Sequence, residues 1–242
     1  MTLKSLLLSS LMLLSAGTAW ADVDINETNF PDEKFRSYLL SQEYGWDEKL
    51  TDSEIAGLRM MSVWSKGIQS LQGIEYFTAL LKLDCYDNQL TSLDVSKNTA
   101  LEYLYCSDNQ LTSLDVSNTA LTNLYCYKNK IQGAAMDALV ESLPTVVSFN
   151  GMQVVYYENE QNVMTTTQVA AAKTKGWIPY YTENGLIWKE YVGVDPSTGV
   201  NNIEATDADD SAPWYTINGD KLAEKPTAPG IYIHGGKKVL VK

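Results

Sequence analysis

The chain has 242 residues, of which 45% are hydrophobic and 20% are charged, and its formal net charge is −12. This length is enough for one or two domains, each with a buried core. The balance is acidic, whereas nucleic acid and anionic membrane surfaces require clustered Lys and Arg, so we expect neither as a partner.

The first 21 residues have the features of a secretory signal peptide. Lys4 precedes an apolar run from Leu6 to Ala16, and Ala19-Trp20-Ala21 forms an A-x-A cleavage signal before Asp22. The apolar run is too short to span a bilayer. We therefore expect residues 1–21 to be removed and the protein to be secreted, extracellular or on the outer cell surface. A buried N-terminal helix is the alternative interpretation.

Residues 22–57 are predicted to form a helical N-terminal cap. The segment FPDEKFRSYLLSQ places apolar side chains near helical spacing, and Pro31 suits the first helical position. The segment LTDSEIAGL carries a capping box, Thr51-x-x-Glu54. Its surroundings also resemble a calcium loop, but Gly45 and Glu48 stand where an oxygen ligand and a glycine are needed. We therefore expect no metal site in this segment.

A ten-residue repeat follows the cap, because DNQLTSLDVS occurs at 87–96 and again at 108–117. Aligned on this segment, similar units start at Leu80, Leu101 and Leu121, and a weaker unit starts at Leu58. Their pattern, L-x-x-L-x-C-x-x-N-x-L-x-x-L, resembles the leucine-rich repeat, whose period is about 20–29 residues. The resemblance implies an α/β fold, with a short solenoid over residues 58–191 in which each unit makes one strand and one return path.

The repeat gives its cysteines and asparagines structural roles. Strand alternation places Cys85, Cys106 and Cys126 on the buried side together with the repeated leucines. Asn88, Asn109 and Asn129 are expected to form a ladder that satisfies backbone groups where the chain leaves each strand. Disulfides or a metal site are the alternatives for the cysteines. Parallel side chains suit a disulfide poorly and three thiols make a poor metal site, so we expect free, buried thiols.

After Ile131 the pattern changes to alternating helices and strands. Segments 133–144 and 165–176 are predicted as helices that end at Pro144 and Gly176, and 152–157 is predicted as a strand between them. WIPYYT and LIWKEY flank Glu183-Asn184-Gly185, which is typical of a hairpin. We expect these units to continue the repeat sheet and to close it. A separate small domain is the alternative.

The C-terminal part is predicted to consist of a linker and a β-rich tail. Residues 192–213 are small, polar and acidic without periodicity, which indicates a flexible linker. Residues 214–242 contain short alternating strands with Asn218-Gly219 and Gly235-Gly236 between them. With the segments PGIYI (229–233) and KKVLVK (237–242), the tail resembles the C-terminal sorting domain of type IX (Por) secretion cargo. The resemblance implies contact with outer-membrane secretion machinery. A β-rich appendage on the solenoid is the alternative.

The sequence offers few candidates for catalysis. His234 is the only histidine and lies in the tail, far in sequence from the cysteines that we expect to be buried. A Ser-His-Asp or Cys-His site is therefore not expected, and no HExxH motif, phosphate-binding glycine loop or nucleophile elbow is present. Asp94 and Asp115 are repeat-equivalent and are expected to make turn contacts. We expect no enzymatic activity and no cofactor. A secreted hydrolase or hydrolase inhibitor is the alternative.

The outward face of the repeat strands offers a binding surface instead. It gathers one tryptophan and five tyrosines, which are residue types that anchor interfaces and stack on sugars. The candidate ligand-binding residues are Trp64, Lys82, Asp84, Tyr86, Tyr103, Tyr105, Asn123, Tyr125 and Tyr127, with Met60, Ser62 and Ser107 beside them. We expect a monomer that recognises a protein or glycan through this concave aromatic sheet face. Tyrosines that serve only as good strand formers, in a purely structural surface protein, are the alternative.

Overall fold

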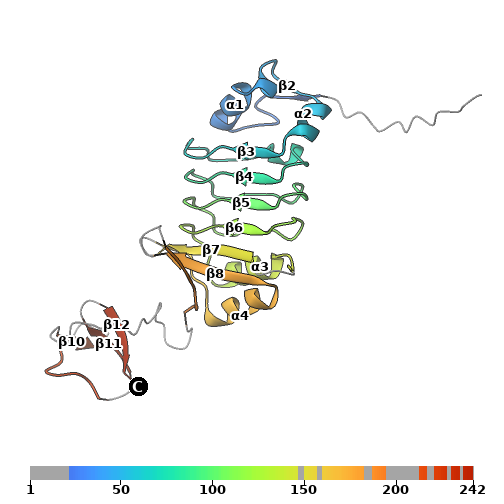
Figure 1. Ribbon diagram of the computed structural model, residues 1–242. Helices are drawn as coiled ribbons and strands as arrows, with labels where there is room; N and C mark the ends of the chain where they lie inside the picture. Colours follow the sequence, from blue (N-terminus) through green and yellow to red (C-terminus); the bar gives the residue numbers. More distant parts are fainter. Residues whose placement is uncertain are drawn as a thin grey trace, which may run out of the picture.

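The computed structural model describes residues 22–146, 150–156, 160–182, 187–194, 213–216, 221–227, 230–234 and 237–241. The predicted signal peptide lies outside these residues, as do most of the predicted linker and the hairpin turn at Glu183-Asn184-Gly185. Figure 1 shows stacked turns that form a column below an N-terminal cap. No helix in the described ranges has both the length and the apolar composition that crossing a bilayer requires.

The N-terminal cap contains helices and a small sheet. Its elements are β1 (Val23–Asp24), α1 (Glu33–Leu40), the 3-10 helix η1 (Glu43–Gly45), β2 (Lys49–Leu50) and α2 (Asp52–Gly57). Strands β1 and β2 pair antiparallel, which was not predicted because strands of two residues show no alternation. Phe30, Phe35 and Leu39 of the cap are completely buried, and the Phe30 ring contacts Phe77 of the first repeat turn. The cap therefore covers the apolar end of the repeat column.

The first cap helix begins at Glu33, two residues later than expected. Asp32, and not Pro31, sets its start, because the Asp32 carboxylate accepts hydrogen bonds from the N–H groups of Lys34 and Phe35 at 2.9 Å each. The other Asp32 oxygen accepts from the N–H groups of Gln69 and Ser70, which belong to the first repeat turn. These bonds lower the pKa of Asp32, although burial opposes them. One carboxylate thus caps α1 and ties the cap to the column.

A seven-stranded sheet runs through the column in chain order. Its strands are β3 (Met60–Ser62), β4 (Lys82–Asp84), β5 (Tyr103–Tyr105), β6 (Asn123–Tyr125), β7 (Asn150–Tyr156), β8 (Trp177–Thr182) and β9 (Trp188–Glu190). Strands β3 to β8 are parallel and β9 is antiparallel to β8. The return segments carry the 3-10 helix η2 (Ile74–Tyr76) and the helices α3 (Ala134–Ser142) and α4 (Thr166–Thr174). The α/β repeat fold is therefore confirmed.

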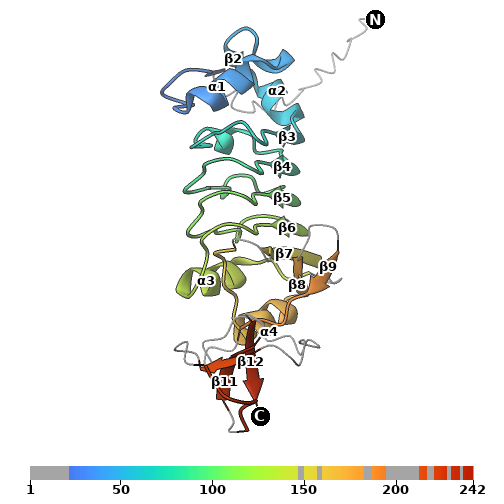
Figure 2. The ribbon, with the colours of Figure 1, turned by 90° about the vertical axis from the view of Figure 1, so that its left-hand side faces the viewer.

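The core is built from columns of equivalent residues, as the repeat predicts. Leu83, Leu104 and Leu124 pair in register along β4, β5 and β6, and all three are completely buried. The next inward position holds Cys85, Cys106 and Cys126, which are also completely buried and free. Figure 2 shows the strands along one side of the stack and the return segments, with α3, along the other. The core therefore lies between the strands and the return segments, and the side chains on the other side of the strands point away from it.

The asparagine ladder is present and has one more rung than predicted. Asn109 Nδ2 donates to the carbonyl groups of Cys85 and Cys106 at 3.0 and 3.1 Å, and its Oδ1 accepts from the Leu90 N–H at 2.9 Å. Asn88 and Asn129 make equivalent bonds. The fourth rung is Asn162, whose Oδ1 accepts from the Ile131 N–H at 2.8 Å. The ladder therefore extends beyond the visible repeats.

The closing units continue the sheet, as expected. Helix α3 buries Met136, Leu139 and Val140, and Thr165 caps α4 with a capping box. Lys175, which ends α4, donates to the carbonyl groups of Glu141 and Leu143 at the end of α3. These bonds join the two helices on the return side of the sheet.

The tail forms a sheet of its own. Strands β10 (Trp214–Thr216), β11 (Gly230–His234) and β12 (Lys237–Val241) pair antiparallel in that order. His234 is 2% exposed, and its ring stacks on Trp214 at a centroid distance of 4.1 Å. The expected short strands are therefore present. The dipeptides Asn218-Gly219 and Gly235-Gly236 lie outside the described residues.

Candidate functional site

The outward side chains of the repeat strands lie in rows, because the strands are parallel and in register. One row runs from Met60 through Lys82 and Tyr103 to Asn123, and the next runs from Ser62 through Asp84 and Tyr105 to Tyr125. A third row, just beyond the strand ends, contains Trp64, Tyr86, Ser107 and Tyr127; backbone hydrogen bonds between adjacent turns hold it in register. Period-two alternation places all three rows on one face.

The rings on this face contact one another and nearby lysines. Tyr105 and Tyr125 stack with their centroids 4.5 Å apart and their planes 18° apart. The ammonium group of Lys82 lies 4.7 Å from the centroid of the Tyr105 ring, which is a cation–π distance. Tyr127 contacts Tyr156 of β7 and Trp188 of β9, at centroid distances of 5.6 and 5.5 Å. Aromatic side chains therefore continue from the repeats into the closing strands.

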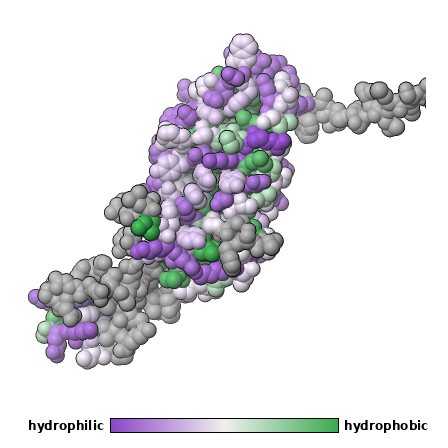
Figure 3. Space-filling model, in the orientation of Figure 1, coloured by the Kyte–Doolittle hydropathy of each residue, from purple (hydrophilic) through white to green (hydrophobic). Residues whose placement is uncertain are grey.

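A shallow hollow of about 260 Å³ lies on this face. Its lining residues are Trp64, Asp84, Tyr86, Tyr105, Ser107, Tyr125 and Tyr127. Trp64 is 57% exposed and Tyr86 is 37% exposed, whereas Ser107 at the bottom is only 1% exposed. In the view of Figure 3, pale and hydrophilic side chains cover most of the column, with smaller hydrophobic patches between them. The hollow is thus an accessible surface of mixed polarity.

Three of the tyrosines around the hollow have raised pKa values, which keep their phenol groups neutral. Burial raises the pKa of Tyr127 to about 12, and nearby Tyr86 and Asp108 add to this rise. Burial, followed by the charges of Asp108 and Asp87, also raises the pKa of Tyr86. The pKa of Tyr105 is raised by burial, by its neighbouring tyrosines and by Asp84. These tyrosines therefore remain hydrogen-bond donors at every physiological pH, in a negative local potential.

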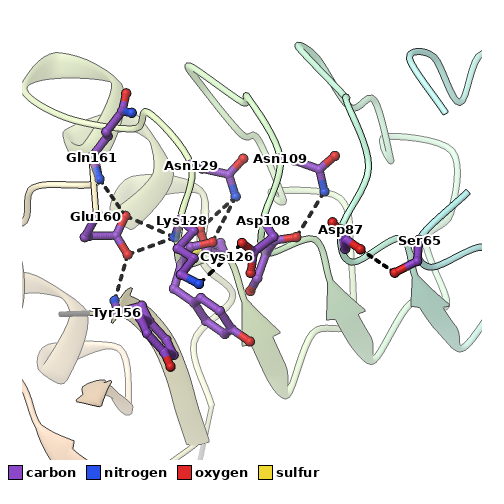
Figure 4. A network of polar contacts seen from close by, with 12 residues as sticks. Ser65, Asp87, Asp108, Asn109, Cys126, Lys128, Asn129, Tyr156, Glu160 and Gln161 are labelled. Carbon is purple, nitrogen blue, oxygen red and sulfur yellow. Dashed lines mark hydrogen bonds and ion pairs between the residues drawn. The ribbon is translucent and has the colours of Figure 1, made fainter. Parts of the chain in front are cut away.

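A column of polar residues borders the hollow at the strand ends (Figure 4). Ser65, Asp87, Asp108 and Lys128 have positive φ angles of 51–54° and occupy equivalent positions in successive turns. Ser65 donates to Asp87, and the Lys128 ammonium lies 3.5 Å from an Asp108 oxygen. Burial raises the pKa of Asp108, while Lys128 opposes that rise. The border therefore places two carboxylates and one ammonium group next to the rings.

Glu160 ends this polar column. Its carboxylate accepts the Lys128 N–H through both oxygens at 3.0 and 2.8 Å, and also accepts the N–H groups of Tyr156 and Asn162. The fourth donor is the N–H of Gln161 (Figure 4). Glu160 thus satisfies backbone donors where the repeats give way to the closing units. Glu160 and Asn162 were not predicted, because an insertion separates them from the regular spacing.

The structure brings most of the predicted site residues to one place. Six of the nine line the hollow, while Lys82, Tyr103 and Asn123 form the neighbouring row on the same face. Tyr156 and Trp188 extend the aromatic surface and were missed, because they come from strands outside the repeat. Their signal in the sequence was the alternation within segments 152–157 and 186–191.

The buried cysteines are separate from this face. Burial raises the pKa values of Cys85, Cys106 and Cys126 well above that of an ordinary thiol. Thiolate is the reactive form of cysteine, so this column is poorly suited to nucleophilic chemistry. Asp94 and Asp115 form a parallel bridge and accept hydrogen bonds from Ser96 and Ser117, in agreement with the predicted turn role.

Comparison with known proteins adds to this picture. No family model matches the chain. A stretch of 71 residues is 39% identical to Internalin J of Listeria monocytogenes serotype 4b (strain F2365), and it covers 29% of this chain and 8% of that protein. The solved functional domain of InlJ from Listeria monocytogenes, which includes a cysteine ladder, is 34% identical and has a TM-score of 0.43, with 48% of this chain and 26% of that chain covered.

A second solved structure aligns over more of both chains. Internalin C2 from Listeria monocytogenes is 20% identical, covers 68% of this chain and 70% of its own, and has a TM-score of 0.51. This chain has a leucine-rich-repeat fold. At this level of identity the likeness to internalin C2 concerns the leucine-rich-repeat fold alone. The chain spans only 8% of the length of Internalin J, so the likeness covers a small part of that protein.

Proposed function

We propose that this leucine-rich-repeat protein is a non-enzymatic binding protein that recognises a protein or glycan through the aromatic face of its parallel sheet. One observation carries the proposal: the outward rows gather aromatic rings on one face, with Trp64 57% exposed and Tyr86 37% exposed. A gathered set of accessible rings beside polar groups is typical of a contact surface.

The arrangement of the rings favours binding. Tyr105 and Tyr125 already stack on one another, so they lose little side-chain freedom when a ligand covers them. Each ring offers an apolar face, and each phenol offers a hydrogen-bond donor. A ligand in the hollow would contact Trp64, Tyr86 and Tyr127 as well. Lys82, Tyr103 and Asn123 would extend the contact along the neighbouring row.

We also infer how the chain is organised for this role. Residues 1–21 would direct export, 22–57 cap the repeats, 58–191 form the solenoid with its closing units, and 192–213 link it to the tail. Residues 214–242 would act as the sorting signal that engages outer-membrane secretion machinery. Their three antiparallel strands form a sheet of their own, which is compatible with a separate signal region. The protein would then act as a monomer outside the cell or on its outer surface.

Binding to peptide and glycan arrays tests the proposed function. The full chain is compared with a Tyr105→Ala/Tyr125→Ala variant that removes the stacked pair. Thr91→Ala/Thr112→Ala is the matched control, because these two threonines are exposed and repeat-equivalent on the return path. We expect a selective signal that the tyrosine variant loses and the threonine variant keeps. A signal that survives in both variants, or no selective signal on either array, would contradict the proposal.

A further inference from the structure

The hollow on the aromatic face exists because one small residue interrupts a row of rings. In the row Trp64, Tyr86, Ser107 and Tyr127, only the β5 turn contributes a side chain without a ring. In the adjacent row, tyrosines on neighbouring strands stack at 4.5 Å. A ring at position 107 would therefore stack on both neighbours. Its absence leaves a slot in this row between Tyr86 and Tyr127, and all three residues line the hollow.

The bottom of this slot holds a hydroxyl group that has no hydrogen bond. Ser107 is 1% exposed, and its Oγ atom is buried without a hydrogen-bond partner among the described residues. The Ser107 hydroxyl acts to lower the pKa of the nearby Tyr127 phenol, but the two hydroxyl groups do not reach hydrogen-bond geometry. Leaving a buried polar atom unpaired is unfavourable. Because Ser107 is only 1% exposed, a ligand reaches its Oγ atom by displacing the side chains that cover it, and a donor placed there would remove that penalty.

The surroundings of the slot favour a cation. Asp84 lines the hollow, and among the described residues its carboxylate accepts the Tyr86 N–H and takes part in no ion pair. Asp87 and Asp108 lie at the border of the hollow. Together with Asp84 they supply three carboxylates, whereas Lys82 and Lys128 supply two ammonium groups. Both of those ammonium groups lie over rings: Lys82 is 4.7 Å from the Tyr105 centroid and Lys128 is 4.1 Å from the Tyr156 centroid. The ring faces of this surface therefore already attract cations.

We propose that the slot between Tyr86 and Tyr127, above Ser107, receives an arginine side chain of a protein partner. This proposal rests on the proposed function and names the partner chemistry. A guanidinium group is flat, so it has the thickness of the missing ring, and it stacks on aromatic faces. Its five N–H donors can bond to more than one acceptor, and both Ser107 and Asp84 line the hollow. The net charge of −12 attracts a basic segment to the whole protein.

Titration with small probes tests the slot directly. The full isotope-labelled chain is titrated with N-acetyl-arginine amide, with the uncharged N-acetyl-citrulline amide of the same shape, and with N-acetylglucosamine. We expect the arginine probe to shift the Ser107 amide and the Tyr86 and Tyr127 ring signals saturably, and more strongly at low ionic strength. The citrulline probe should bind at least about tenfold more weakly, because it lacks the charge. Equal binding of citrulline and arginine, or saturation by the sugar alone, would overturn the proposal.

Two substitutions separate the slot from the rest of the face. Ser107→Tyr fills the slot with the ring type found elsewhere in the row and should abolish the arginine response. Ser113→Tyr, on the exposed return path of the same repeat, is the control and should leave it unchanged. Ser107→Ala keeps the space but removes the acceptor, and should weaken binding about threefold to tenfold. Unchanged binding by a folded Ser107→Tyr variant would refute the slot, and unchanged binding by Ser107→Ala would refute it even if the tyrosine variant fails to fold.

The same variants distinguish this proposal from the broader one. An array ligand that is lost with Tyr105→Ala/Tyr125→Ala but kept with Ser107→Tyr would contradict the arginine slot and leave the aromatic face standing. A ligand that binds all of these variants equally would contradict the proposed function itself. Loss of the array ligand in Tyr105→Ala/Tyr125→Ala and in Ser107→Tyr, together with an arginine response of the parent chain, would support both proposals.

Discussion

Asn162 Nδ2 donates a hydrogen bond to the carbonyl oxygen of Cys126 at 2.8 Å, although 36 residues separate the two. The same amide donates to the Val154 carbonyl at 3.0 Å, and its Oδ1 accepts the Ile131 N–H. Cys126 directly follows β6, and Val154 lies inside β7 at the irregularity where the pairing with β8 shifts register between Gln153 and Val155. Asn162 therefore does for the closing unit what the repeated asparagines do for the regular turns.

The first prediction concerns this fourth rung. Asn162→Ala should lower the free energy of unfolding by about 2–5 kcal/mol, because it leaves several buried backbone groups unpaired. Urea unfolding of the full chain measures this loss. Gln161→Ala is the neighbouring control: its side chain is exposed, so the change should be below about 0.5 kcal/mol. Similar stability of the two variants would show that Asn162 is not part of the ladder.

The buried thiols should be unreactive in the folded protein. Cys85, Cys106 and Cys126 are completely buried, and their raised pKa values leave almost no thiolate at neutral pH. A thiol reagent followed by mass spectrometry should label none of them in native buffer and all of them in denaturant. Rapid labelling of any one of the three without unfolding would contradict their place in the core.

The same thiols predict a loss of stability at alkaline pH. An unfolded cysteine ionises near pH 8.5, whereas the folded thiols stay protonated. Protons are then lost only on unfolding, so stability is full below about pH 8.5 and falls as the pH rises above it. The slope is at most about 1.4 kcal/mol per pH unit for each thiol.

Substitution of one thiol checks this slope. Cys85→Val is suitable, because Val63 occupies the equivalent buried position in the preceding turn. Unfolding measured under reducing conditions between about pH 8 and pH 9, below the pKa of about 10 at which an unfolded tyrosine ionises, should show about a third less dependence on pH in this variant. An identical slope in the variant and the parent chain would exclude the thiols as its source.

Most of the fold could be predicted from the sequence, because equivalent residues of successive repeat units occupy the same structural environment. Leu83, Leu104 and Leu124 were predicted inward from spacing alone, and the structure pairs them in register. The helical cap was predicted with its capping box but without the β1–β2 pair, and α1 starts at Glu33, capped by Asp32, and not at Pro31. A carboxylate that also binds the Gln69 and Ser70 N–H groups draws on contacts about 40 residues away, which local patterns do not encode.

The candidate site was predictable in composition but not in shape. Alternation along the strands placed the rings on one face, and the structure agrees. The hollow depends on Ser107, which lies between Tyr86 and Tyr127 only after three turns stack. Tyr156 and Trp188 join the rings through a sheet that extends beyond the repeats. Ser107, Tyr156 and Trp188 take their places in the site only when the turns stack in register. A repeat pattern of about 20 residues describes one turn and therefore cannot show this.

The tail prediction concerns export. Removing residues 214–242 in the native producer should abolish delivery to the outside of the cell while the repeats still fold, because β10–β12 form a sheet separate from the repeat sheet. Fractionation with detection of the repeat region measures delivery, and the circular dichroism spectrum of the purified truncated chain checks folding. Normal delivery of the truncated, folded chain would rule out a sorting role for the tail.

The most direct test of the aromatic face is calorimetric titration of an array-selected ligand into the parent chain and into the Tyr105→Ala/Tyr125→Ala variant. Both side chains are only half-buried, so the midpoint of thermal unfolding should shift by less than about 4 °C. The affinity should fall at least about tenfold, because the ligand loses two ring contacts. Unchanged affinity in a variant with unchanged stability would contradict the account.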